Sequence, residues 1–160
     1  MRIIVASDSH GNVSPLERII ENMKPDVFIF CGDGTADVEN LEYIYTDVQF
    51  HYVKGNCDFG NYPISKEIKV GSKRIYFAHG HTYSVKNDDF EIFSEAKRRG
   101  VDILLYGHTH NPFVETRNGI VVMNPGSVAR PNFGSPTFGV IDFVGQNMLA
   151  DIRELKNNSL

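Results

Sequence analysis

The stretch Ile3-Ile4-Val5-Ala6-Ser7-Asp8-Ser9-His10-Gly11-Asn12 decides how the remainder of the chain is interpreted. Its apolar, β-branched start is typical of a buried strand, and its abrupt change to polar residues is typical of a loop. Asp8 and His10 are two residues apart, so at a strand end their side chains can project to the same side. A carboxylate and an imidazole directed at one point are half of a metal site.

Four more apolar runs end in loops of the same kind. They are 27–31 before Gly32-Asp33-Gly34, 50–53 before Gly55-Asn56-Cys57-Asp58, 75–78 before His79-Gly80-His81, and 103–106 before Gly107-His108-Thr109-His110. Five of the six histidines therefore follow predicted strands, while His51 lies inside one and is better interpreted as half-buried or solvent-facing. Ligands of open α/β sheets bind beyond the carboxyl ends of the strands. The repetition indicates a metal site at that edge.

Length and composition fit a single domain over 1–156 with a frayed tail at 157–160. The 160 residues are 41% hydrophobic and 22% charged, with a net charge of -4, so no basic surface for nucleic acid is expected. No stretch approaches the ~18 consecutive apolar residues of a membrane span, and the first strand leaves no room for a signal peptide. The two cysteines, Cys31 and Cys57, are too few for a disulfide framework. We therefore expect a cytoplasmic protein without a membrane partner.

Local patterns predict the order of the elements. A capping box at Ser14-Pro15-Leu16-Glu17 opens a helix over 14–22, and further helices are predicted over 37–45 and 88–99. Hairpins are predicted around Gly71-Ser72, Asn118-Gly119 and 145–147. The first half then has parallel strands and helices, and the second half is rich in antiparallel hairpins. Two mixed sheets packed face to face, with helices outside, accommodate both.

The ordered motifs resemble those of the calcineurin-like metallophosphoesterase superfamily. They are Asp8-Ser9-His10, Gly32-Asp33, Gly55-Asn56, His79-Gly80-His81 and Gly107-His108-Thr109-His110. The resemblance is strongest to the small, uncapped prokaryotic phosphodiesterases, which share their fold with a scaffold subunit of the retromer coat, and Asn124-Pro125-Gly126-Ser127 also matches a loop of that group. It implies an α/β fold, a four-layer αββα sandwich of two mixed sheets flanked by helices.

The resemblance also implies a dinuclear site. Asp8, His10, Asp33 and His110 would hold one ion, and Asp33, Asn56, His79 and His108 would hold the other. Asp33 would bridge, since a carboxylate can span two ions ~3.5–4 Å apart. Mixed nitrogen and oxygen ligands suit divalent transition metals, with Mn expected first and Ni, Fe, Co or Zn as alternatives.

The implied reaction is hydrolysis of a small or exposed phosphodiester by in-line attack of a hydroxide that bridges the two ions. Such ions lower the pKa of bound water from 15.7 towards ~7. The catalytic residues implied are Asp33, Asn56 and His81. Two alternatives stay open: a phosphomonoesterase on the same site, and a catalytically silent metal-binding scaffold. Nothing in the sequence names the substrate, and a homodimer is an open expectation.

Three residues near the motifs have less certain roles. Many superfamily members carry histidine at the position of Cys57, and a buried thiol would be a poor proton donor to a leaving alkoxide. We therefore expect either that His81 takes this role or that the enzyme needs good leaving groups. Asp58 is expected either to orient a ligand histidine or to be an ordinary turn residue. Arg130 would bind phosphate or lie on the solvated surface.

Overall fold

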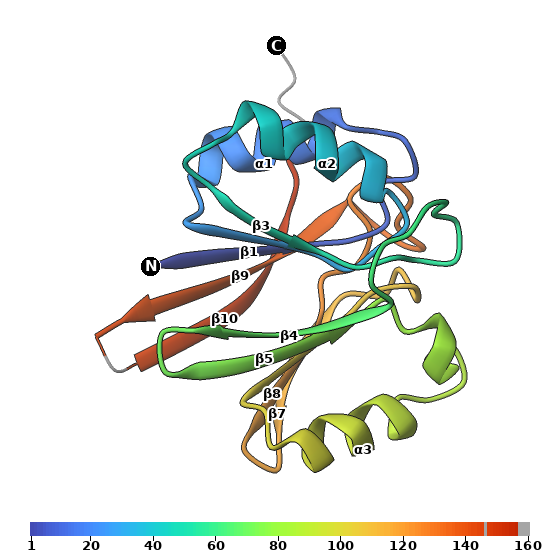
Figure 1. The fold of residues 1–160 in the computed structure, drawn as a ribbon, viewed down its shortest axis with the longest axis vertical. Coiled ribbons are helices and arrows are strands. Elements are labelled where there is room, and N and C mark those ends of the chain that lie inside the picture. Colours follow the sequence, from blue (N-terminus) through green and yellow to red (C-terminus); the bar gives the residue numbers. More distant parts are fainter. Residues whose placement is uncertain (146, 157–160) are drawn as a thin grey trace.

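The strands form two five-stranded sheets in a computed structural model that describes residues 1–145 and 147–156. The elements in chain order are β1 (Arg2–Ala6), α1 (Ser14–Met23), β2 (Val27–Phe30), α2 (Thr35–Ile44), β3 (Gln49–Tyr52), β4 (Ser65–Val70), β5 (Lys73–Ala78), the 3-10 turn η1 (His81–Tyr83), α3 (Phe90–Arg99), β6 (Ile103–Tyr106), β7 (Phe113–Arg117), β8 (Ile120–Asn124), β9 (Thr137–Val144) and β10 (Asn147–Glu154). Figure 1 shows the two sheets lying one above the other with helices on their outer sides.

Each sheet combines parallel and antiparallel pairs. The first sheet has the order β10-β9-β1-β2-β3, in which β1, β2 and β3 are parallel and the β9–β10 hairpin is antiparallel. The second has the order β4-β5-β6-β8-β7, in which β5, β6 and β8 are parallel. The expected αββα sandwich of two mixed sheets is confirmed.

The expected parallel opening and the expected later antiparallel hairpins are both present. β1, β2 and β3 are parallel, and the hairpins β4–β5, β7–β8 and β9–β10 are antiparallel. The structure adds pairing between strands that are distant in sequence: β5, β6 and β8 are parallel to one another, and β9 of the last hairpin pairs with β1. Because β7 separates β6 from β8 in the sequence, no local pattern predicts the β6–β8 pair.

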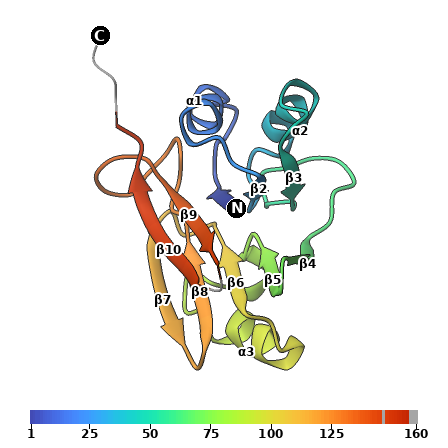
Figure 2. The ribbon, with the colours of Figure 1, turned by 90° about the vertical axis from the view of Figure 1, so that its left-hand side faces the viewer.

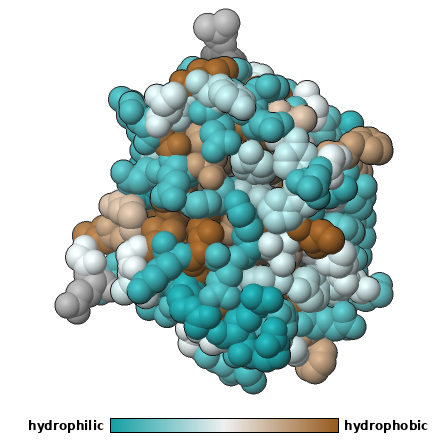
Figure 3. Space-filling model, viewed as in Figure 1, coloured by the Kyte–Doolittle hydropathy of each residue, from teal (hydrophilic) through white to brown (hydrophobic). Residues whose placement is uncertain are grey.

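Three apolar layers hold the sandwich together. Helices α1 and α2 pack on the first sheet through residues such as Leu16, Ile19 and Leu41, and α3 packs on the second through Ile92 and Phe93. The sheets meet at a core formed by Ile3, Val5, Val27, Ile29, Phe77, Ile103, Leu105 and Met123. Figure 2 shows the resulting order of helices, sheet, sheet and helix. In Figure 3 hydrophobic colour is concentrated along the seam between the sheets, and the helical faces are mainly hydrophilic.

The start of α1 differs from the expected capping box. Val13, with φ -72° and ψ -34°, occupies the N-cap position, and no side-chain hydrogen bond caps the helix. Because Val13 already has a helical backbone, Ser14 lies in the first turn, where its hydroxyl cannot serve as the cap. Proline remains in the first turn, as expected.

No helix in the described ranges has both the length and the apolar character that a bilayer crossing requires. The expected frayed tail at 157–160 and the centre of the last hairpin at Gln146 lie outside the described residues.

Gly139 allows the two sheets to approach one another. It pairs with Val5 on β1, and a Cβ placed on it would overlap the sulfur of Met123 on the facing sheet and lie 3.2 Å from the Cβ of Val5. Both neighbours are completely buried, so neither can move into solvent. We expect Gly139→Ala to lower the free energy of unfolding by about 1–3 kcal/mol, the usual cost of overpacking.

Urea unfolding of a double-mutant cycle measures this constraint. In a Met123→Val background the shorter side chain leaves room for the added methyl group, so the Gly139→Ala penalty is expected to shrink. An equal penalty in both backgrounds would contradict the proposed contact.

Candidate metal centre

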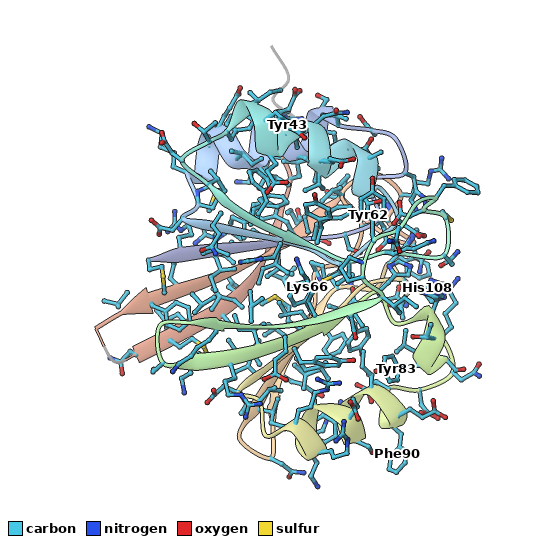
Figure 4. All side chains as sticks on the ribbon, viewed as in Figure 1. Tyr43, Tyr62, Lys66, Tyr83, Phe90 and His108 are labelled. Atoms are coloured by element: carbon cyan, nitrogen blue, oxygen red, sulfur yellow. The ribbon has the colours of Figure 1, made fainter. Side chains whose placement is uncertain are left out.

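The seven predicted ligand residues follow five different strands. Asp8 and His10 follow β1, Asp33 follows β2, Asn56 follows β3, His79 follows β5, and His108 and His110 follow β6. The parallel strands of both sheets end at one edge of the sandwich, so residues up to 102 positions apart in the sequence meet there. In Figure 4, His108 lies at this edge, between Tyr62 and Tyr83.

The backbone at these positions is unusual. Eight non-glycine residues have positive φ in the described ranges, and five of them are predicted ligands: Asp8 (60°), His10 (48°), Asp33 (59°), His108 (66°) and His110 (58°). A left-handed backbone costs an L-residue roughly 1–2 kcal/mol, although Asp and His tolerate it better than most. Such strain persists only where surrounding contacts impose it, and it is concentrated at functional sites. The backbone conformation thus identifies these residues as a candidate functional site independently of the chemistry of their side chains.

One group of predicted ligands consists of Asp8, His10 and His110. Nε2 of His110 lies 3.1 Å from Oδ1 of Asp8, and Nε2 of His10 lies 3.8 Å from the same oxygen. The two imidazole nitrogens are 3.4 Å apart. The three possible ligand atoms therefore surround one point, and Asp8 is completely buried.

A second group consists of Asp33, His79 and His108, with Asn56 beside it. Nε2 of His79 lies 3.4 Å from Oδ2 of Asp33, 3.2 Å from the amide oxygen of Asn56 and 3.1 Å from Nδ1 of His108. All four residues that the resemblance assigns to the second ion are thus within reach of one position.

Asp33 lies between the two groups. Its Oδ2 is 3.4 Å from His79 and 4.0 Å from His10, while Oδ1 accepts a hydrogen bond from the Cys57 amide. Burial raises the pKa of Asp33, but hydrogen bonding and the positive charge of His79, together with the Cys57 amide, hold that pKa well below its usual range. The side chain is therefore an anion at neutral pH.

Two histidines have their tautomers set by backbone carbonyls. Nδ1 of His79 lies 2.7 Å from the Cys31 oxygen, and Nδ1 of His110 lies 2.6 Å from the Arg130 oxygen. A carbonyl only accepts, so Nδ1 carries the proton and Nε2 of the neutral ring presents a lone pair to the centre. Lone pairs and carboxylates facing each other require a cation between them.

A proton or a metal ion can supply that positive charge. Burial lowers the pKa of His79, but the hydrogen bond and charge of Asp33 and the charge of Asp8 outweigh it and raise the pKa. The hydrogen bond to Asp8 raises the pKa of His110. Burial, then the charge of His79, lowers that of His108 to about 4, so its lone pair is available at neutral pH. This set of imidazoles, carboxylates and an amide oxygen fits divalent transition metals, whose binding displaces the protons.

Asp58 supports the ligand loops rather than a ligand histidine. Its carboxylate accepts backbone hydrogen bonds from Asp33 (2.8 Å), Gly34 (2.7 Å), Thr35 (3.0 Å) and Gly55 (2.8 Å). It thereby joins the loop after β2 to the loop after β3 and caps the amino end of α2. Gly55 passes so close to Asp33 that a Cβ there would overlap its carboxylate.

Further supports were not identified from the sequence. The Asp37 carboxylate accepts hydrogen bonds from the Ser9 hydroxyl (2.6 Å) and the Gly11 amide (3.0 Å). The Ser127 hydroxyl donates to the carbonyl oxygen of Asp8 at 2.8 Å. Asp37 resembles an ordinary acidic residue in the first turn of a helix, and only its burial in the fold distinguishes it. The motif Asn124-Pro125-Gly126-Ser127 is visible in the sequence, but its contact with Asp8 exists only in the folded protein.

The expectation that Cys57 is buried is wrong. Cys57 is exposed and lines the cleft beside the centre. Partial desolvation of its thiol, followed by the hydrogen bond and charge of Asp33, raises the pKa of Cys57. The Cys57 sulfur lies within 4.8 Å of a possible ligand atom of His10 and of Asp33. Arg130 is exposed and lines the same cleft.

His81 also faces the centre. Its ring centroid lies 5.4 Å from that of His79 and 6.2 Å from that of His108. Its Nδ1 is buried and has no hydrogen-bond partner among the described residues. Burial, followed by the charge of His79, lowers its pKa. A buried polar atom without a partner is uncommon in folded proteins and is consistent with a group that binds a ligand.

Comparison with protein families identifies the fold and its chemistry. The calcineurin-like phosphoesterase superfamily domain matches residues 1–146. The chain belongs to this superfamily. The expected family is therefore confirmed, and the superfamily is metal-dependent.

Individual relatives of this phosphoesterase span most of its length. Probable metallophosphoesterase YsnB of Bacillus subtilis is 32% identical over 136 residues, which cover 82% of this chain and 77% of the relative. Phosphodiesterase YfcE of Escherichia coli is 30% identical over 170 residues, covering 89% and 88%. The crystal structure of Vps29 from Chaetomium thermophilum matches with a TM-score of 0.81 at 22% identity, covering 99% and 89%, and this likeness shows the fold alone.

Asp58 offers a test of how the phosphoesterase holds its ligand loops. In Asp58→Asn one oxygen becomes a donor, so it faces backbone N–H groups that it cannot bind. We expect Mn²⁺ affinity to fall about 10- to 100-fold, the usual effect of removing a residue that orients ligands. Isothermal titration with Mn²⁺ measures this change, and Asp47→Asn, at an exposed position, is the matched control. Unchanged affinity would show that the loops hold their shape without Asp58.

Proposed function

We propose that the protein is a metal-dependent phosphodiesterase whose reaction centre is the cluster of seven predicted ligands. The observation that carries the proposal is the arrangement of Asp33, which lies within 4.0 Å of a histidine from each group. A single carboxylate between two sets of ligand residues can bridge a pair of divalent ions. Relatives named as phosphodiesterases support the choice of reaction.

The ligand assignment follows the two groups. Asp8, His10, Asp33 and His110 would hold one ion, and Asp33, Asn56, His79 and His108 would hold the other. We propose Mn as the native metal, with Ni, Fe, Co and Zn as the alternatives that the donor set admits. When bound, the two ions would supply a water of lowered pKa as the nucleophile and positive charge for the phosphoryl oxygens.

The chain contributes the remaining parts of the reaction. Most ligands are neutral, and Asp8 and Asp33 are the two anionic ones, so two divalent ions leave the centre positive and attractive to a phosphodiester anion. Arg130 lines the cleft beside His10 and binds a phosphoryl oxygen. Asn56 would hold an ion through an amide oxygen that carries no charge and lies 3.2 Å from Nε2 of His79. The buried edge of the sandwich excludes water from the rear of the site.

The scaffold alternative is disfavoured by the strain at the centre. A protein used only for binding partners has no need of five left-handed residues around facing carboxylates and imidazoles. A phosphomonoesterase would use the same centre, so only the substrates distinguish it from a diesterase.

Reconstitution with Mn²⁺ tests the function. We expect the loaded protein to hydrolyse bis(p-nitrophenyl) phosphate with a higher kcat/KM than p-nitrophenyl phosphate, measured by release of nitrophenolate. Asp33→Asn serves as the inactive control and should lose more than about a hundredfold in kcat, since even residues that only orient ligands contribute ten- to a hundredfold. A higher kcat/KM for the monoester would favour the phosphomonoesterase, and metal binding without any turnover would favour the scaffold.

His81 is proposed as the residue that protonates the leaving group. We expect His81→Ala to slow aryl phosphodiesters with leaving groups of high pKa more than those with leaving groups of low pKa. Because His81 donates only when protonated and its pKa is lowered, its contribution should increase as the pH falls. The measurement is the dependence of log kcat/KM on leaving-group pKa at two pH values. An equal loss across the series would exclude an acid role and leave the requirement for good leaving groups.

A further inference from the structure

Two separate clefts open onto the reaction centre. One has a volume of about 900 Å³ and includes His108, His110 and Lys86, and we name it the Lys86 groove. The other has a volume of about 440 Å³ and includes His10, Asp33 and Phe59, and we name it the Phe59 cleft. No residue lines both clefts. They meet where Nε2 of His10 lies 3.4 Å from Nε2 of His110, so a phosphoryl group at the centre has access to both.

The Phe59 cleft offers a flat apolar surface beside a cation. The Phe59 side chain is 92% exposed, yet it directly follows Asp58, whose carboxylate is fixed by four backbone N–H groups. The backbone that carries the ring is therefore anchored, and the exposed ring lines the cleft. Arg130 lines the same cleft and provides a positive charge for the phosphoryl oxygens. An exposed aromatic ring held beside a phosphate site is suited to stacking a planar group.

The Lys86 groove is polar where it approaches the centre. Lys86 lines this part of the groove together with His108 and His110, and its ammonium provides a positive charge there. Across the groove, the Asn132 amide nitrogen donates to the Thr109 carbonyl oxygen at 2.8 Å and to the Asn111 side-chain oxygen at 2.9 Å. These bonds leave the Asn132 oxygen and the Asn111 nitrogen with no hydrogen-bond partner in the described part of the chain.

The far wall of the groove carries more carboxylates than cations. Arg117 donates to both oxygens of Asp89, at 2.9 and 3.0 Å, and also to Glu115, while the Tyr106 hydroxyl donates to Asp89 at 3.2 Å. Asp88 adds a further carboxylate to the groove lining. A ligand in this groove would therefore meet hydrogen-bond acceptors on that wall and the ammonium and the two amides nearest the centre. These groups match a hydroxyl-bearing arm rather than a bare aromatic ring.

We propose that the two clefts hold the two ester arms of one phosphodiester, with a planar aryl or heteroaryl arm against Phe59 and a polar, hydroxyl-bearing arm in the Lys86 groove. This inference rests on the proposed phosphodiesterase function and specifies its substrate class. A monoester, or a diester with one small arm, fills only one cleft. The preference for a diester then arises from the second cleft rather than from the chemistry at phosphorus.

Two diesters with the same leaving group test the proposal. Thymidine 5′-(p-nitrophenyl) phosphate carries a planar arm and a polar arm, while methyl p-nitrophenyl phosphate has nothing to place in the Lys86 groove. With the Mn²⁺-loaded protein, we expect kcat/KM for the thymidine ester to exceed that for the methyl ester by about tenfold or more, equivalent to a single good contact.

Variants in the two clefts should act differently on the ratio of kcat/KM for the thymidine ester to kcat/KM for the methyl ester. Lys86→Ala and Asn132→Ala should reduce it to below about threefold by slowing the thymidine ester more than the methyl ester. Phe59→Ala should slow both esters by about five- to tenfold and leave the ratio unchanged, because both present the nitrophenyl ring to the same cleft. Phe90→Ala and Lys97→Ala are the controls, since both residues are exposed on α3 and outside either cleft.

The outcomes distinguish the two-cleft proposal from the proposed phosphodiesterase function on which it rests. Equal kcat/KM for the two esters in the parent, or equal effects of the variants and their controls, would overturn the two-cleft proposal while leaving the phosphodiesterase intact. Absence of turnover of every diester by protein that binds Mn²⁺ would overturn both. Thermal unfolding of each variant checks that any change in kcat/KM is not a loss of folded protein.

Discussion

The structure depends on burying carboxylates and imidazole lone pairs around the same space. Asp8 and His79 are completely buried, and Asp33 is 3% exposed. Burying such groups without a cation costs several kcal/mol for each charge, and the left-handed backbone at five of the positions adds to this cost. The arrangement is stable only if the rest of the molecule forces it and a positive charge enters it. Every other feature of the fold serves one of these two requirements.

The packing of the two sheets and three helices imposes this arrangement. Three separate apolar layers fix the two sheets and the three helices, so the strand ends reach the edge as rigid supports. Carboxylates that accept several N–H groups then join neighbouring loops, as Asp58 joins the loops after β2 and β3 and Asp37 closes the loop after β1. The Ser127 hydroxyl connects the loop after β8 to Asp8. The supports therefore link the sheets to each other as well as the ligands to their own strands.

How much of the fold and of the site can be predicted from the sequence depends on how far apart along the chain the interacting residues lie. The strands and the residues that follow them were predicted because apolar runs and polar motifs are adjacent in the chain. Their convergence followed from the rule for parallel strands. The role of Asp37, the exposure of Cys57 and the return of the last hairpin to β1 were missed, because each depends on segments that meet only in the folded protein. Asp58 was recognised as a candidate, but its partners are backbone N–H groups, which every sequence contains.

The size of the protein determines where selectivity can reside. With ten strands and three helices over the described ranges, the sandwich leaves the edge beyond its strands open, so substrate contacts must come from the loops that also support the ligands. The segment 55–59 illustrates the consequence: its glycine permits close approach to Asp33, its asparagine faces His79, its aspartate fixes the backbone, and its phenylalanine projects into a cleft. Under the proposed function, metal binding and substrate contact would therefore be coupled within five residues. A change that moves Phe59 through the backbone also moves Asn56, whereas truncation of the ring alone does not.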